Sequence, residues 1–300
     1  MPHYLKHHSY GEYIFDHSWA NAYAQAGGAY YPKSLSAVPF TPATGPRLLT
    51  DSDDPAVKAT MARGLVSLVD QHQLSSAHIN FLPADDARLL ADAGWLIRSG
   101  TQFHWHNQGY EDFDGFLQNL SSRKRKNIRK ERASIADAGV TMLALSGDDI
   151  KPHHIDHFYA FYLSTIDRKW GGAYLTRRFF DIVNASMAEK ILLVMAIYDG
   201  DLIGGALNFI GTDTLYGRNW GASRHIQNLH FEACYYQAIE FAITHKLRCV
   251  EAGAQGFHKV QRGYLPVTTH SAHLMAHDGW RKAVERFLRA EARGVADEQN

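Results

Sequence analysis

The spacing of apolar residues along the first half of the chain predicts alternating strands and helices. Apolar residues recur at helical spacing over Pro55–Gln71, and a second helix is predicted over Asp85–Ala93. A loop with proline and glycine, residues 41–47, precedes the longer helix. Short apolar runs bounded by polar residues predict strands at Ser34–Phe40, His78–Leu82 and Trp95–His106.

The second half repeats this order of elements. A helix with one apolar face is predicted over Leu229–His245, with Asn228 as its N-cap. Asp199 and Gly200 form a hairpin turn signal between the first two strands of this half. Strands are predicted at Ile191–Tyr198, Leu202–Ile210, Thr214–Gly221, Arg248–Glu251 and Val267–His277, followed by a helix over Arg281–Arg289.

The repeated order predicts an α/β fold with mixed sheets, built from two similar units. A mainly helical stretch, residues 112–188, lies between the two series of strands. We therefore expect one unit over residues 1–111 and a second over residues 112–300 that includes the preceding helical segment.

Composition and charge narrow the classes of function. The 31 basic residues balance 31 acidic residues, which gives no support to extensive coating of nucleic acid or membrane. Two cysteines, Cys234 and Cys249, are too few for a disulfide scaffold. No apolar run approaches the roughly 18 residues of a membrane span, and no signal-peptide pattern follows Met1, so a cytoplasmic location is expected.

A run of cationic residues predicts a helix start with unusual charge. Seven of the ten residues from Arg123 to Arg132 are lysine or arginine, and Ser121 or Ser122 precedes them as a cap. Positive charge is unfavourable at a helix N-terminus, so one hypothesis is that Arg123, Lys124, Arg125 and Lys126 bind a phosphate or another anion. The alternative is a solvated helix face.

Eighteen histidines raise the question of a metal site. His153 and His157 have helical i, i+4 spacing, and His104 and His106 share one strand face. Neither pair has a third ligand nearby in the sequence, and the H-E-x-x-H pattern is absent from it. We therefore expect no metal site.

The segment Val250–Tyr264 concentrates groups that suit a binding site. Glu251 ends a predicted strand, and strand ends are where α/β sheets place ligands. Gly253 and Gly256 allow a sharp turn after the strand. The cation-capable side chains that follow are His258, Lys259 and Arg262.

The pattern of acidic residue, glycine and then Lys-x-x-Arg-Gly-Tyr resembles the C-terminal signature of FemAB-like proteins, in the bacterial group described as peptidoglycan biosynthesis/recognition. The resemblance implies tandem units of the acyl-CoA N-acyltransferase (GNAT) fold, of which the first looks incomplete here. It covers essentially the whole chain, on Ser9–Tyr13, Val38–Arg47, Gln102–Asn107, Leu120–Lys126, Arg168–Gly171, Gly205–Phe209, Leu229–Ile239 and Glu251–Gly256.

The GNAT pyrophosphate loop is not clear in this sequence. Gly221-Ala222-Ser223-Arg224 precedes the helix of the second unit without the usual glycine spacing. In the first unit the equivalent place holds Thr44-Gly45-Pro46-Arg47, which makes Arg47 a candidate anion ligand.

The resemblance implies transfer of an acyl group to an amine, which requires a base and an acid. Glu251 is the candidate base, and Tyr264 is the candidate acid or hydrogen-bond donor. The alternatives are that Glu251 pairs structurally with Lys259 or Arg262, and that Tyr264 is a core residue. The candidate substrate-binding residues are His258, Lys259, Arg262, Gln255, Arg218, Trp220 and His230.

Three functions stay open at the level of the sequence. The first is an N-acyltransferase with acyl-CoA as co-substrate and no covalently bound cofactor. The second is a transferase that takes an aminoacyl group from aminoacyl-tRNA to a small-molecule or peptide amine, in cell-wall precursor metabolism. The third is a non-catalytic ligand-recognition protein on the same fold.

Overall fold

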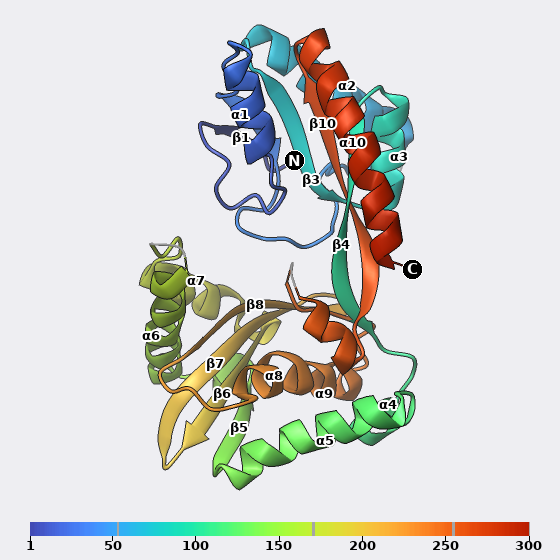
Figure 1. Cartoon of the computed structure of the whole chain (residues 1–300). Helices are drawn as coiled ribbons and strands as arrows, with labels where there is room; N and C mark the ends of the chain where they lie inside the picture. The colour runs from blue at the N-terminus through green and yellow to red at the C-terminus, as the bar shows by residue number, and fades with distance from the viewer. Residues whose placement is uncertain (53, 170–171, 254–255, 300) are drawn as a thin grey trace. The chain divides into compact units, whose positions relative to one another are not determined.

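The chain forms two compact units, one of which combines residues from both ends of the sequence (Figure 1). The structure, a computed structural model, describes residues 1–52, 54–169, 172–253 and 256–299. Residues 1–102 and 266–300 form the discontinuous unit, and residues 103–265 form the continuous unit. The expected ranges, 1–111 and 112–300, differ because the C-terminal strand and helix belong with the N-terminal residues.

The strands of the discontinuous unit follow the order β1-β2-β3-β10-β4. Their bounds are Tyr4–Lys6 for β1, Lys33–Ser36 for β2, Ser76–Leu82 for β3, Leu265–Met275 for β10 and Leu96–His106 for β4. Strand β2 is parallel to β3, whereas β10 is antiparallel to β3 and carries a register shift between His270 and Ala272. Because β10 pairs with β3, the C-terminal residues of the chain belong to this unit.

Helices cover both faces of this sheet. Apolar residues of α2 (Pro55–Gln71) and α3 (Ala84–Asp92) share one core with Ile79 of β3. Residues of α1 (His17–Gln25) and α10 (Asp278–Gln299) share another core with Leu96 of β4. Helix α2 has the predicted bounds, because the Asp54 carboxylate accepts from the Ala56 amide at 2.8 Å and Pro55 needs no amide partner at the first turn.

The continuous unit holds the end of β4 and then β9-β8-β7-β6-β5. The bounds are Cys249–Glu251 for β9, Thr214–Ala222 for β8, Asp201–Ile210 for β7, Ile191–Tyr198 for β6 and Val140–Leu145 for β5. Strand β5 lies inside the stretch expected to be mainly helical. Its six residues pair with β6, an interaction that local spacing does not reveal.

The helices of the continuous unit pack on both faces of its sheet. They are α4 (Phe113–Gln118), α5 (Ser122–Asp137), α6 (Pro152–Lys169), α7 (Arg177–Met187), α8 (Leu229–Phe231) and α9 (Gln237–Thr244), with a π-helical turn at Glu232–Tyr236 and short 3₁₀ turns at Gly147–Asp149, Ala188–Lys190 and Phe257–Arg262. The predicted helix over Leu229–His245 is thus interrupted by the π turn.

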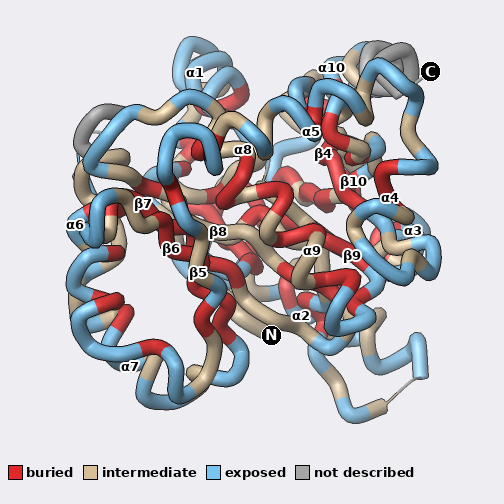
Figure 2. The backbone as a smooth tube through the Cα atoms, turned by 90° about the horizontal axis from the view of Figure 1, so that it is seen from below, coloured by how far each residue is buried: buried red, intermediate tan, exposed pale blue. Residues whose placement is uncertain are grey.

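Strand β6 shows how the two faces of this sheet are filled. Its residues Leu192 and Val194 pack with residues of α9, whereas Ile191 and Leu193 pack with residues of α6 and α7. Figure 2 shows β6 and β7 buried along most of their length. Among the described residues, no helix is both long and apolar enough to cross a lipid bilayer.

Candidate functional site

Strands β8 and β9 part at the position of Glu251. They pair in parallel from Thr214 opposite Cys249 to Tyr216 opposite Glu251, after which β9 ends and β8 continues to Ala222. A Cβ atom on Gly217 would come within 3.4 Å of the Ala252 Cα atom, so glycine allows the close approach at the point of divergence. Glu251 therefore occupies the end of a strand, as predicted.

Glu251 faces a histidine of the neighbouring strand. His104 of β4 lies directly opposite Glu251 in the antiparallel register. The distance from His104 Nδ1 to Glu251 Oε1 is 3.9 Å, and the two side chains are 10% and 12% exposed. Burial, together with His106 and Lys259, lowers the pKa of His104 to about 4, so this imidazole is neutral near pH 7.

A pocket of about 700 Å³ lies where β8 leads into α8. Its walls include Trp220, Arg224, His225 and His230, together with Thr165 of α6. The Trp220 and His230 rings meet edge to face at 5.5 Å. Two predicted substrate-binding residues thus line one pocket of the continuous unit.

The start of α8 differs from the prediction. Asn228 has a positive φ of 68°, and its side chain makes no cap hydrogen bond. Its Nδ2 atom instead donates to the Ser134 hydroxyl of α5 at 3.0 Å. The predicted N-cap was wrong, because the side-chain amide of Asn228 bonds to a residue distant in sequence and does not cap the helix.

Aromatic contacts connect the pocket with the 250–264 segment. Tyr235 lies in the π turn, and its ring is 5.4 Å from that of His230. The Tyr235 hydroxyl and His258 Nε2 are 2.8 Å apart, at hydrogen-bond distance. His258 is exposed, and burial together with Arg262 and Lys259 lowers the pKa of its imidazole.

Lys259 and Arg262 bind groups of the protein itself. Lys259 is 1% exposed, and its Nζ atom donates to the Gly253 carbonyl at 2.8 Å. Arg262 forms an ion pair with Glu131 of α5 at 2.7 Å and donates to the His258 carbonyl at 2.8 Å. Both cations therefore hold the segment in shape, which differs from the substrate contact expected for them.

Tyr264 lies in the hydrophobic core. The side chain is fully buried, and its ring is 5.5 Å from that of Tyr235. Burial raises the pKa of its hydroxyl well above the usual range, and no described residue bonds to that hydroxyl. This placement favours the core interpretation over the role of acid.

Arg218 is a further residue predicted to bind substrate. Arg218 lies at a register shift of β8, between Gly217 and Asn219, and its side chain is half-buried. Gln255 lies outside the described residues.

The basic run has mixed surroundings. The Ser121 hydroxyl accepts from the Lys124 amide at 3.4 Å, which confirms the predicted cap. Arg123 and Lys126 are exposed, and Lys124 is half-buried. Arg125 Nη1 lies 3.3 Å from the Leu120 carbonyl and 3.5 Å from those of Leu117 and Gln118, so it binds the end of α4.

Arg47 is also engaged by backbone oxygen atoms. It is a buried residue of the discontinuous unit, and its guanidinium donates to the Ala43 carbonyl at 2.7 Å and the Gly45 carbonyl at 2.9 Å. The side chain stabilises its own loop, and this surrounding does not support the predicted anion contact.

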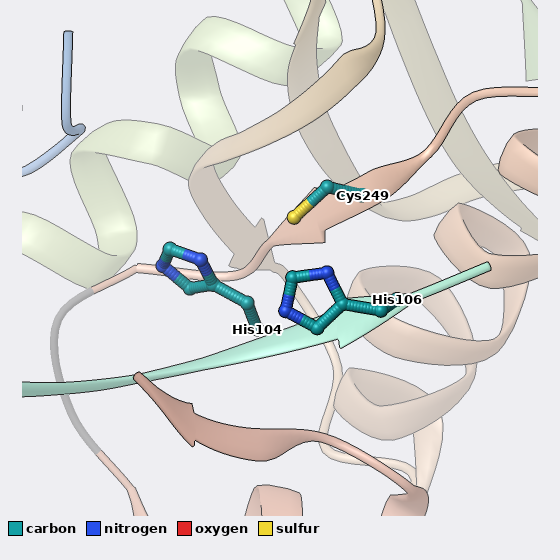
Figure 3. A group of neighbouring side chains, drawn as sticks. All are labelled: His104, His106 and Cys249. Atoms are coloured by element: carbon teal, nitrogen blue, oxygen red, sulfur yellow. The ribbon is translucent and has the colours of Figure 1, made fainter. Parts of the chain in front are cut away.

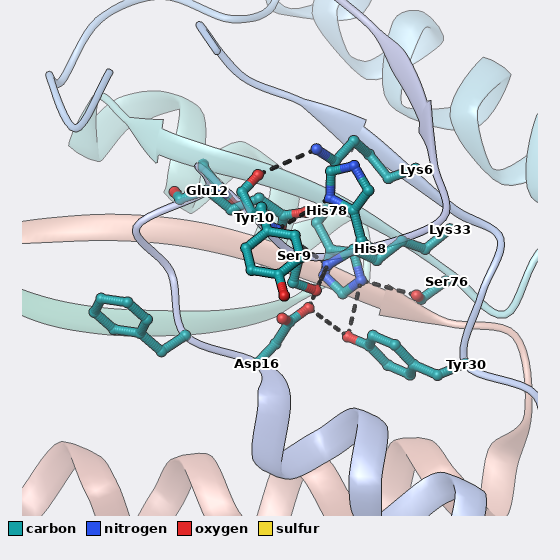
Figure 4. A network of polar contacts seen from close by, with 12 residues as sticks. Lys6, His8, Ser9, Tyr10, Glu12, Asp16, Tyr30, Lys33, Ser76 and His78 are labelled. Carbon is teal, nitrogen blue, oxygen red and sulfur yellow. Dashed lines mark hydrogen bonds and ion pairs between the residues drawn. The ribbon is translucent and has the colours of Figure 1, made fainter. Parts of the chain in front are cut away.

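The discontinuous unit contains a buried polar network that the sequence did not predict (Figure 4). Lys33 is 0% exposed, and its Nζ atom forms ion pairs with Glu12, at 2.8 Å, and with Asp16. Burial by itself raises the pKa of Asp16, but Lys33, His78 and Ser9 together hold it below its usual range. Tyr30 donates to Asp16 at 2.7 Å and lies 3.3 Å from His78 Nε2.

The network continues between two strands. His78 Nδ1 of β3 lies 2.7 Å from His273 Nδ1 of β10, and burial lowers the pKa of both imidazoles, that of His78 to about 3. Neutral rings of this kind act as hydrogen-bond donors and acceptors rather than as charges. The network thus joins segment 9–16 to the strands of its unit, and only contacts distant in sequence create it.

Solved structures with the same fold have little sequence in common with this chain. L-PGS from Bacillus licheniformis has a TM-score of 0.55 at 10% identity, with 81% of this chain and 77% of that chain covered. FemX has a TM-score of 0.55 at 11% identity, with 83% and 85% covered. A conserved protein of unknown function from Bacteroides thetaiotaomicron has a TM-score of 0.51 at 13% identity, with 82% and 80% covered.

These likenesses show the fold, and the expected α/β class with a mixed sheet is confirmed. The comparison with curated proteins found no match. A sequence model of the FemAB-like family, described as peptidoglycan biosynthesis/recognition, matches residues 1–300. The chain therefore belongs to the FemAB-like family.

Proposed function

We propose that the protein is an N-acyltransferase that moves an acyl or aminoacyl group from an activated carrier to an amine acceptor in cell-wall precursor metabolism. Membership of the FemAB-like family supports the class of reaction. The observation that carries the proposal is Glu251, a carboxylate at the divergence of β8 and β9 that faces His104 at 3.9 Å.

Glu251 acts as the proton acceptor in this proposal. The amine nitrogen of the acceptor forms a bond to the carbonyl carbon of the donor, and the bond from that carbon to the leaving sulfur or oxygen breaks. The amine proton passes to Glu251, directly or through water, and the leaving atom takes up a proton. A carboxylate within reach of the reacting amine contributes typically 10²–10⁴-fold in such a step.

The pocket at the β8–α8 junction is the proposed donor site. Acyl-CoA and aminoacyl-tRNA share phosphate groups and an activated carbonyl, and Arg224 and His225 of the pocket wall are exposed cation-capable side chains. Trp220 supplies an aromatic face for an adenine ring, which both donors carry. The acceptor is a small-molecule or peptide amine near exposed His258.

The test combines donors, acceptors and a matched pair of variants. Purified protein is incubated with acetyl-CoA or with aminoacyl-tRNA, each with muropeptides that carry a free amine, and mass spectrometry detects the acylated product. We expect turnover with one donor class, and a loss of kcat of about 10²–10⁴-fold in Glu251→Gln.

Glu189→Gln is the control, because Glu189 is an exposed carboxylate of the same unit. Near wild-type kcat in folded Glu251→Gln would remove Glu251 from the mechanism. Product formed from neither donor would count against the transferase assignment.

One observation favours the second candidate, a non-catalytic ligand-recognition protein. Tyr264 is buried, and Lys259 and Arg262 bind groups of the protein, so the segment offers fewer free reactive groups than its sequence indicates. Muropeptide binding measured by calorimetry, without turnover from either donor, would establish this function instead.

A further inference from the structure

Strands β4 and β9 bring metal-ligating side chains together on one face. His106 lies opposite Cys249 in the antiparallel register, one pair along from His104 opposite Glu251. The intervening residues Trp105 and Val250 point into the core with α9, and side chains alternate along a strand. The two histidines and Cys249 therefore share the other face (Figure 3).

The ligand atoms of these side chains are close enough to bind one ion. One nitrogen of His104, one nitrogen of His106 and the Cys249 sulfur all lie within 4.8 Å of one another, the one such group that the described residues contain. We propose that His104, His106 and Cys249 form a site for a zinc-type transition-metal ion. The sequence predicted no metal site because neither pair of histidines has a third ligand nearby in the sequence. Cys249 is distant in sequence from both His104 and His106, so only the fold brings it to them.

The donor set selects the class of metal. Imidazole nitrogen and thiolate sulfur suit Zn²⁺ and similar ions, whereas Mg²⁺ and Ca²⁺ require oxygen ligands. Zinc bonds of 2.0–2.3 Å in tetrahedral geometry place ligand atoms about 3.5 Å apart. The ligand atoms, which lie within 4.8 Å of one another, thus need to close by roughly 1 Å to bind the ion.

The surroundings of the three side chains suit a cation. Glu251 Oε1 lies 3.9 Å from His104 Nδ1, so a carboxylate stands beside the group. His106 is exposed, which gives an ion access from solvent. Three protein ligands leave a fourth position for water or a substrate atom.

The proposal goes beyond the proposed transferase function and does not depend on it. Its test contains neither donor nor acceptor, so failure to find turnover leaves the result on metal unchanged. Co²⁺ is the probe, because it takes zinc-type sites and a cobalt–thiolate bond gives a charge-transfer absorption band. The full-length protein is first dialysed against a chelator and then titrated with Co²⁺.

We expect one Co²⁺ per chain, a charge-transfer band, and loss of both signals when Zn²⁺ is added. Cys249→Ser should abolish the band. Cys234→Ser should keep it, because Cys234 is the other cysteine of the chain and lies outside the group. His106→Gln, at an exposed position, should weaken Co²⁺ binding at least about 10-fold, the loss typical of a removed ligand or its support.

Each contrary result is equally clear. The proposal is wrong if the wild-type protein shows no charge-transfer band, or if the band persists in Cys249→Ser. If Cys249→Ser does not fold, as judged by circular dichroism, His106→Gln decides: unchanged Co²⁺ affinity in that folded variant overturns the site.

Discussion

The carboxylate of Glu251 and the imidazole of His104 face each other across β4 and β9, with 3.9 Å between Oε1 and Nδ1. The antiparallel register creates this relationship, because it sets two residues 147 positions apart directly opposite each other. The sequence interpretation identified Glu251 through its position at a strand end, but considered His104 only with His106 as a metal pair.

The first prediction concerns the coupling of these two residues in catalysis. If they act as one unit, Glu251→Gln and His104→Gln each lower kcat, and the double variant is little worse than the more impaired single variant. The measurement is kcat and KM for all four proteins with the active donor. Losses that multiply in full would show that the residues act independently.

His106→Gln is the control for this cycle. It removes a neighbouring imidazole from the same strand face and leaves the Glu251–His104 contact intact. An activity loss in this variant that Zn²⁺ addition relieves would be a metal effect, separate from the coupling.

The second prediction concerns the buried charges of the discontinuous unit. Lys33 forms ion pairs with the carboxylates of both Glu12 and Asp16, and all three side chains are almost fully inaccessible to solvent. Removal of one partner from a buried ionic group leaves uncompensated charge, which destabilises by roughly 3–5 kcal/mol. We expect Lys33→Met to lower the denaturation midpoint of this unit strongly, as measured by urea unfolding.

Arg88→Met serves for comparison. Arg88 pairs with Asp85 of the same unit, but the two side chains are 76% and 84% exposed, so water replaces much of the lost interaction. An equal loss of stability in the two variants would show that the buried ion pairs of Lys33 contribute no more to the free energy of unfolding than an exposed pair.

The third prediction concerns Gly221, which precedes the helix of the second unit without the glycine spacing of a GNAT pyrophosphate loop. A Cβ atom there would lie 2.0 Å from the Phe161 carbonyl oxygen, so glycine allows β8 to approach α6. Gly221→Ala should force these elements apart and destabilise the protein by about 1–3 kcal/mol. The free energy of unfolding measures this loss.

Gly64→Ala gives a contrast of opposite sign. Gly64 is exposed inside α2, and an added Cβ atom would meet no heavy atom of the described residues within 4 Å. Alanine at such a position should stabilise the helix by about 0.5–1 kcal/mol. A stable Gly221→Ala protein would contradict the packing role.

Local sequence patterns predicted this fold where the determining interactions are local. The bounds of α2 follow from its apolar spacing, its Asp54 cap and Pro55. The turn at Asp199 and Gly200 follows from the need for positive φ at both residues, with observed values of 53° and 84°. Residues close in sequence decide both features.

Interactions distant in sequence explain what the patterns missed. Strand β10 inserts between β3 and β4 although some 160 residues separate it from β4. In the candidate site, the sequence offered Glu251 as a possible partner of Arg262, whereas Glu131 of α5 forms the ion pair. Cation-rich patterns therefore identified the charged side chains of the segment but could not show which of these charges pair with groups of the protein itself.

The last prediction tests the state of Lys259. Burial lowers the pKa of this ammonium group from 10.5 to about 8. Between these values the unfolded chain holds a proton that the folded chain has lost, so folding stability rises with pH across this window. Below pH 8 both states are protonated, and the desolvated charge destabilises the fold by roughly 3 kcal/mol at most.

Urea unfolding at intervals from pH 7 to pH 10 measures this effect in wild-type protein and in Lys259→Met. Methionine matches the length of the side chain without a proton to lose, so wild type should gain stability relative to the variant as pH rises through about 8 to 10. Lys190→Met, at an exposed position, controls for the loss of one positive charge from the chain. A difference between wild type and Lys259→Met that stays constant over this range would show that Lys259 is not desolvated as its contacts indicate.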